Sequence, residues 1–225
     1  MPTIHLLRVF CSEDGSGGNP LAVFLDGSAV SAESRQGVAA ELALSETVFV
    51  DDAERGEIRI FTPSVELDFA GHPSVGTAWL LAEQRTPVEA LNPPAGEVPV
   101  RYQDGMSFCT ARPEWGPAYE WVELGSPEEV EALTGPPAGS DLIGAWAWID
   151  EPAGVVRARV FPVGIGIAED EATGAAALLL AERLGRPIEI RQGRASRINA
   201  RPRDAGWVEI GGRSALDEVR EHDVP

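Results

Sequence analysis

Two segments of the sequence are apolar on nearly every side at helical spacing. They are residues 74–84 (SVGTAWLLAEQ) and residues 173–184 (TGAAALLLAERL). A helix that is hydrophobic all round has no face to present to water, so the rest of the fold must enclose it. A chain with two such helices needs enough sheet to cover both, and we predict that each helix lies inside a curled sheet.

The two apolar helices also reveal an internal repeat. Residues 78–83 (AWLLAE) resemble residues 177–182 (ALLLAE) at an offset of about 99. Upstream, residues 59–61 (RIF) resemble residues 159–161 (RVF). Leu-Ala-Glu is a common helical string, so the repeat depends on the matching upstream strand and loop glycine as well. Together they predict two similar α+β halves, each ordered strand, short glycine-containing loop, buried helix.

The other predicted elements are short. Residues 32–44 predict a helix, because apolar side chains recur on one face, and Ser126 followed by Pro127 is typical of a helix start. Residues 111–123, with two prolines and three large aromatic residues, could form the crossover between the halves. Segments rich in β-branched and aromatic residues predict strands at residues 4–10, 21–25, 47–50, 58–62, 98–102, 144–149, 155–161, 188–191 and 207–210.

The composition excludes several classes of function. A formal net charge of −18 argues against nucleic acid and against anionic membranes as partners. No run approaches the roughly 18 apolar residues that a membrane-spanning helix needs. The two cysteines cannot form a disulfide framework, so we expect a reducing, cytoplasmic location.

The inventory of reactive residues is equally restrictive. The chain has no lysine, which excludes a lysine Schiff base. Its three histidines and two cysteines show no ligand spacing, so we expect no metal site. No Gly-x-Ser-x-Gly motif supports a serine hydrolase.

Ionisable side chains precede or begin both apolar helices. At an offset of 98, His72 matches Asp170 and Gly76 matches Gly174. Helix N-termini present unpaired N–H groups and a partial positive charge. Two such termini facing one cleft could hold a carboxylate without any lysine. The alternatives are that His72 is a capping or core histidine and that Asp170 is an ordinary N-cap.

Glu46 follows the helix of residues 32–44 and precedes an apolar strand, where its carboxylate would be partly buried. Burial raises the pKa of a carboxyl group, as a general acid or base near neutral pH requires. Among 36 acidic residues a solvated turn glutamate is an open alternative, and spacing alone does not select Glu46.

The glycine-rich residues 15–20 precede no helix, so they fit neither the P-loop nor the dinucleotide-binding motif. They read as a turn that approaches a ligand or the opposite half, or as a plain flexible turn.

The motifs, in order along nearly the whole chain, resemble those of the PhzF-like phenazine biosynthesis family. EDEATG at residues 169–174 is similar to that family's EDPATG, and Gln192-Gly193-Arg194, Ser196 and Gly211-Gly212 look like compressed forms of its closing elements. The first-half matches are GNPLAV at residues 18–23, LSET at 44–47, IRIFTP at 58–63, EL at 66–67 and FAGHP at 69–73.

The resemblance implies an α+β fold of the diaminopimelate epimerase type. Two pseudo-symmetric halves would each wrap a curved, mostly antiparallel sheet around a central buried helix, with the active site in the cleft between them. We expect residues 1–112 and 113–225 to form these halves, and the C-terminal tail could pack back on the first. The family is usually homodimeric, so the resemblance implies a homodimer.

The resemblance also implies site residues. In the phenazine enzyme the glutamate that corresponds to Glu46 shuttles a proton between carbons of its substrate, and His72 and Asp170 would assist. Amides around Gly71 and Gly174 would bind the substrate carboxylate. Further substrate contacts are expected at Gly18, Asn19, Thr173 and Ala175. The expected protein is a cofactor-independent isomerase that shifts a proton on a small carboxylate-bearing metabolite.

Two positions depart from the family motif. Glu171 stands where the motif has proline, and Ala175 stands where it has serine, which removes a hydroxyl donor and would change substrate preference or affinity. Two alternatives therefore stay open: a non-catalytic dimeric binding or scaffold protein, and a carboxylate-based amino-acid epimerase. A two-thiol racemase is not expected, because Cys11 and Cys109 lie outside both motif loops.

Overall fold

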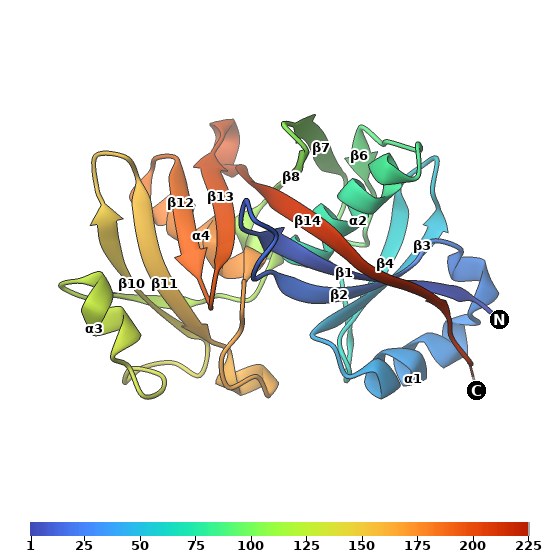
Figure 1. Ribbon diagram of the computed structural model, residues 1–225, viewed down its shortest axis with the longest axis horizontal. Coiled ribbons are helices and arrows are strands. Elements are labelled where there is room, and N and C mark those ends of the chain that lie inside the picture. Colours follow the sequence, from blue (N-terminus) through green and yellow to red (C-terminus); the bar gives the residue numbers. More distant parts are fainter. Residues whose placement is uncertain (225) are drawn as a thin grey trace.

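The computed structural model describes residues 1–224 of the 225-residue chain. Its strands form one continuous twisted sheet with the order β5-β4-β3-β2-β1-β14-β13-β12-β11-β10-β9, and β8, β7 and β6 branch from β14. Figure 1 shows two lobes side by side, with β14 running from one lobe into the other. Most strand pairs are antiparallel; β2–β3, β9–β10 and β11–β12 are parallel. This arrangement confirms the predicted α+β class.

The first lobe places one helix on each face of its sheet. The core around α2 includes Leu7, Val9 and Leu21, while the separate cluster under α1 includes Phe24 and Phe49. Alternate side chains of β1 and β2 point to opposite faces, which is why these strands serve both clusters. The elements are β1 (Thr3–Cys11), β2 (Asn19–Phe24), α1 (Ala32–Leu42), β3 (Glu46–Asp52), β4 (Glu57–Phe61), β5 (Glu66–Leu67) and α2 (Gly71–Glu83).

The second lobe wraps its sheet around α4. The buried side chains of α4, such as Leu178 and Leu180, belong to the same core cluster as α2, so the two apolar helices share one interior. The elements after α2 are β6 (Ala90–Leu91), β7 (Val98–Gln103), β8 (Met106–Ala111), β9 (Glu120–Glu123), α3 (Pro127–Glu131), β10 (Ile143–Asp150), β11 (Val155–Phe161), α4 (Gly174–Leu184), β12 (Ile188–Gln192), β13 (Ser196–Pro202) and β14 (Val208–Glu221).

The helix starts differ from the sequence prediction in one respect. Helix α2 begins at Gly71, three residues before the predicted start, so His72 lies in its first turn. Gly71 is therefore the counterpart of Gly174, the first residue of α4, and the predicted match of Gly76 to Gly174 is wrong. Gly76 instead lies inside α2, where an added Cβ would meet Val9 Cγ2 at 2.5 Å. The apolar strings alone could not show that α2 is 13 residues long and α4 only 11.

Strand β14 is also longer than predicted. The sequence indicated residues 207–210, but the strand continues to Glu221 because its second part pairs with β1, with Leu7 opposite Leu216. Its first part pairs with β13 and β8. Since β8 lies before residue 112 and pairs with β14, hydrogen bonds cross the predicted boundary between the halves, and that boundary stays a prediction. Within residues 1–224, each helix is too short or too polar to cross a membrane.

Candidate active site

The N-termini of the two buried helices meet at Gly71 and Gly174. An added Cβ on Gly71 would lie 2.9 Å from Gly174 Cα, and one on Gly174 would lie 2.8 Å from Gly71 Cα and 2.8 Å from the His72 nitrogen. Glycine is therefore required by close approach at both positions. The first turns of both helices carry N–H groups that the helices leave without an internal partner, and their partial positive charges face each other. Such a junction favours an anionic group.

Glu46, the first residue of β3, lies against His72 of α2. His72 Nδ1 is 3.4 Å from Glu46 Oε2, and the two side chains are 4% and 16% exposed. Strand β3 holds Glu46 because the next residues, from Thr47 to Val50, are all buried and fix the start of the strand. The structure thus brings together two of the three residues expected to do chemistry, although they are 26 positions apart in the sequence.

Burial sets the protonation of this pair. It raises the pKa of Glu46 to about 7, although the neighbouring Ser45 hydroxyl opposes the shift. Burial also lowers the pKa of His72 to about 4, against the opposing charge of Asp170. At neutral pH the imidazole is therefore neutral, and the Glu46 carboxyl is divided between its acid and base forms. A group with its pKa near the working pH is well suited to both taking and returning a proton.

Asp170 is held in the same region by three side chains. Its Oδ1 accepts the Asn19 amide at 2.9 Å, and its Oδ2 accepts the Thr173 hydroxyl at 2.6 Å. Gln192 donates to the Asp170 carbonyl at 2.9 Å and to Thr173 Oγ1 at 2.9 Å. Burial raises the pKa of Asp170, the Thr173 hydrogen bond lowers it, and the charge of Glu46 raises it further. Asp170 is thus close enough to Glu46 and His72 for the charge state of each of the three groups to affect the others.

The other predicted substrate-binding residues lie around this cluster. Asn19 and Thr173 use their side chains to hold Asp170. Gly18 donates its N–H to the Ser196 hydroxyl at 2.9 Å. The methyl group of Ala175 lies beside Gly116, where an added Cβ would meet it at 2.9 Å. The structure places all of these near the helix junction, and their contacts with a substrate stay a prediction.

Two atoms of the cluster lack a partner. Among residues 1–224, Glu46 Oε2 and His72 Nε2 are buried and accept or donate no hydrogen bond. Buried polar atoms without a partner are costly and therefore uncommon in folded proteins. A ligand bound beside Glu46 and His72 would supply partners for both atoms.

Sequence reasoning did not select Tyr119 or Gln192 as site residues. Burial raises the pKa of Tyr119, and the charges of Asp170 and Glu46 raise it further, so its phenol stays protonated and lies near both carboxyls. The signal in the sequence was the aromatic crossover of residues 111–123, which was assigned only a connecting role. Gln192 belonged to a motif string whose function the sequence did not suggest.

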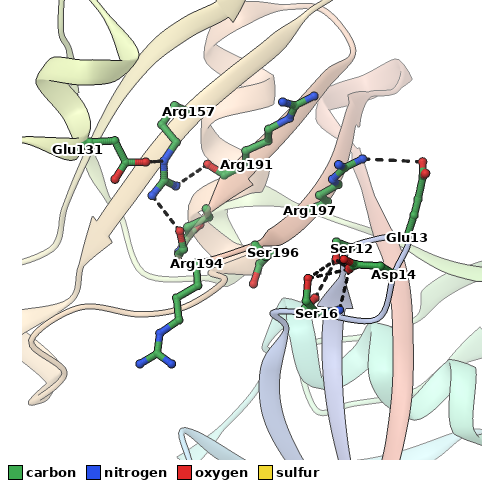
Figure 2. A pocket seen from close by; sticks show the side chains of 13 residues that line it. Ser12, Glu13, Asp14, Ser16, Glu131, Arg157, Arg191, Arg194, Ser196 and Arg197 are labelled. Atoms are coloured by element: carbon green, nitrogen blue, oxygen red, sulfur yellow. Dashed lines mark hydrogen bonds and ion pairs between the residues drawn. The ribbon is translucent and has the colours of Figure 1, made fainter.

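A pocket of about 550 Å³ lies between the turn that joins β1 to β2 and the turn that joins β12 to β13. Figure 2 shows its two walls: Arg194 and Ser196 lie on the second lobe, and Ser12, Asp14 and Ser16 lie on the turn between β1 and β2. Gln192 lines the pocket and also bonds Thr173, whereas Glu46, His72 and Asp170 are not among the lining residues. In the described part of the chain, no group of three or more histidine, cysteine, aspartate or glutamate side chains is arranged to hold a metal ion.

Glu46, whose pKa burial raises to about 7, lies beside the neutral His72 and near two helix N-termini, an arrangement suited to acid/base chemistry on an anionic group. The sequence model of the phenazine biosynthesis-like (PhzC-PhzF) family matches residues 7–135. A trans-2,3-dihydro-3-hydroxyanthranilate isomerase of Pseudomonas aeruginosa is 33% identical over an alignment that covers 88% of this chain and 91% of that protein. The chain therefore belongs to the PhzC-PhzF family and is a PhzF-like isomerase.

Solved structures support the fold assignment. A PhzF family protein of Bacillus anthracis superposes with a TM-score of 0.82 at 18% identity, covering 99% of each chain. A structure described as a predicted epimerase from Pseudomonas aeruginosa superposes with a TM-score of 0.74 at 24% identity, again covering 99% of each chain. At these identities the likeness concerns the fold alone.

Proposed function

We propose that this protein is a cofactor-independent isomerase that shifts a proton on a small carboxylate-bearing metabolite, with Glu46 as the acid/base group. The observation that carries the proposal is the buried pair of Glu46 and His72, 3.4 Å apart and beside the junction of two helix N-termini. A proton shift between two carbons needs one group that can take a proton from one carbon and deliver a proton to the other. Glu46, mostly buried and with a pKa of about 7, has these properties.

The surrounding groups have separate roles in this proposal. The N–H groups at Gly71 and Gly174 bind the substrate carboxylate and so fix which carbon faces Glu46. His72, neutral at pH 7, offers a hydrogen bond to Glu46 or to the substrate without adding a charge that would hold the glutamate permanently ionised. Asp170 is fixed by Asn19 and Thr173, and the charge of Glu46 helps to raise the pKa of its carboxyl group.

The relative of Pseudomonas aeruginosa suggests the first compound to test. That protein is named as an isomerase of trans-2,3-dihydro-3-hydroxyanthranilate, which carries a carboxylate. We include this compound in a panel of small cyclic and amino acids, because Ala175 replaces the motif serine and alters the donors available to a ligand.

Deuterium incorporation in heavy water tests the proposal. The wild-type protein should introduce deuterium into one member of the panel, and Glu46→Gln should slow the incorporation by about a hundredfold or more, as expected for the loss of a general acid/base. Glu41→Gln, at an exposed position of α1, is the matched control and should behave as the wild type.

The outcomes separate the alternatives. Deuterium at the α-carbon of an amino acid, with loss of chirality, would replace the isomerase by an epimerase. Binding of a carboxylic acid without deuterium incorporation in any compound would favour a binding protein. Incorporation that survives Glu46→Gln would overturn the role of Glu46.

A further inference from the structure

Glu171, one of the two positions at which the chain departs from the family motif, uses its carboxylate to join two loops. Its Oε1 accepts the backbone N–H of Arg194 at 2.9 Å and the hydroxyl of Ser196 at 2.9 Å. Both donors lie in or beside the turn that connects β12 to β13. Glu171 therefore ties the loop that carries Asp170 to this turn.

The Ser196 hydroxyl extends the connection to the first lobe. Ser196 Oγ is buried and accepts the backbone N–H of Gly18 at 2.9 Å. A hydroxyl has a single proton, so by donating it to Glu171 the serine keeps its lone pairs for Gly18. Gly18 directly precedes Asn19, whose amide donates to Asp170 at 2.9 Å. This series of hydrogen bonds thus leads from Glu171 back to the carboxylate of Asp170, the residue that precedes it.

The backbone is shaped around this connection. Gly193 has a φ of +57°, and an added Cβ would lie 2.3 Å from Glu171 Cδ, so the turn packs directly against the glutamate. Figure 2 shows Ser196 on the wall that faces Ser12 and Ser16, where the two lobes approach each other. Hydrogen bonds between segments so far apart in the sequence fix the position of one segment relative to the other.

We propose that Glu171 is a positioning residue for Asp170: through Ser196 it holds the Gly18–Asn19 segment against the Asp170 loop. This fixes the direction from which Asn19 presents its amide to the carboxylate. A proline, which the family motif has at this position, offers no side-chain acceptor for either donor. The tether is therefore a property of this chain's form of the motif. Its effect on catalysis rests on the proposed function, whereas the tether itself does not.

Hydrogen–deuterium exchange of the full-length protein, without any ligand, tests the tether. The amide protons of Gly18 and of the residue 170–174 loop should exchange about fivefold faster or more in Ser196→Ala and Glu171→Ala, the change expected when one buried hydrogen bond is lost. Glu171→Gln keeps an oxygen acceptor and should retain most of the protection. Arg194→Ala is the matched control, because it keeps the backbone N–H that Glu171 accepts and removes a guanidinium that points away from Ser196 in Figure 2.

A double variant sharpens this test. If Glu171 and Ser196 act as one unit, Glu171→Ala combined with Ser196→Ala should exchange no faster at Gly18 than the faster single variant. Exchange rates that multiply would contradict the tether, as would an unchanged rate in Ser196→Ala. Circular dichroism shows whether Glu171→Ala folds; if it does not, Ser196→Ala decides, because it removes a single oxygen atom.

The effect of Glu171 on catalysis is measured with the reaction that the wild-type protein is found to catalyse. Glu171→Ala should lower kcat by about tenfold and move the pH profile, with a smaller change in KM, and Glu171→Gln should restore both. Lost protection with an unchanged kcat and pH profile would overturn the positioning role. If the wild type isomerises no compound, the proposed function fails, and the exchange data alone still decide whether the tether exists.

Discussion

Replacement of Glu46 by glutamine should stabilise the protein, and the gain should grow as the pH rises. Burial raises the pKa of Glu46 from 4.5 to about 7, so its ionisation opposes folding. Below about pH 4 the carboxyl is protonated in both the folded and the unfolded state and contributes no difference. Between pH 4.5 and 7 the unfolded chain has released this proton and the folded chain has not, so the wild type loses stability as the pH increases.

The size of the gain in stability follows from the shift in the pKa of Glu46. A displacement of the pKa from 4.5 to about 7 corresponds to about 3 kcal/mol in the free energy of unfolding once both states are ionised. The charge of Glu46 also raises the pKa of Asp170, so its removal should add to the gain. A glutamine amide at this site needs a new hydrogen-bond partner, at a cost of about 1 kcal/mol that does not vary with pH. The pH dependence of the difference is therefore the quantity to measure.

Urea unfolding of the wild type and of Glu46→Gln at pH 4, 5, 6, 7 and 8 measures this pH dependence. The difference in free energy of unfolding should rise by about 3 kcal/mol from pH 4 to pH 8 in favour of glutamine. Glu41→Gln, which removes an exposed charge from the same lobe, should differ from the wild type by less than about 0.5 kcal/mol throughout. A difference that stays flat with pH would refute the buried, high-pKa state of Glu46.

Four further predictions concern the site and the assembly. With Glu46 as the base, kcat/KM should rise through pH about 7, which a pH–rate profile measures; a flat profile from pH 5 to 9 would contradict it. Gly174→Ala should lower the free energy of unfolding by about 1–3 kcal/mol in urea, because its Cβ would lie 2.8 Å from Gly71 Cα. The same variant should weaken the binding of a carboxylate in calorimetry. The control Gly37→Ala, whose added Cβ has nothing within 4 Å, should stabilise the protein by about 0.5–1 kcal/mol. Tyr119→Phe should raise KM about fivefold with an unchanged circular dichroism spectrum, since its protonated phenol lies near both carboxyls; an unchanged KM would place the hydroxyl outside the substrate site. The homodimer that the resemblance implies should sediment at twice the monomer mass of 24.0 kDa, and a monomer at micromolar concentration would be contrary to it.

The parts of the fold that could be predicted from the sequence are those with a strong local pattern. Helices α2 and α4 are apolar on all sides, and β11 is rich in valine, so their positions were predicted to within a few residues. The start of α2 was missed because Gly71, His72 and Pro73 read as a loop, although proline is well tolerated in a first helical turn. Strand β14 was cut short because residues 213–221 lack an apolar period, and their strand structure comes from pairing with β1.

The site residues also divide into those that the sequence could indicate and those that depend on tertiary packing. Glu46 could be proposed only through the motif resemblance, because nothing local separates it from other acidic residues; its burial and its contact with His72 depend on how β3 and α2 pack. Tyr119 was missed because it lies in a crossover segment without a periodic pattern, and the effect of both carboxyls on its pKa depends on the tertiary structure. Glu171 was noted only as the loss of a proline, since its two hydrogen-bond donors lie more than 20 residues further along the chain.

The pairing of β1 with β14 also determines the order in which the protein can fold. Thr3 is opposite Glu221, so β1 lacks one neighbour until β14, far along the chain, has been synthesised. Until then one edge of β1 exposes unpaired N–H and C=O groups to other chains. Contacts of such long sequence separation slow folding. The two lobes therefore look like separable repeats but are interlocked, and a fragment that ends after β8 would leave β1 without its partner.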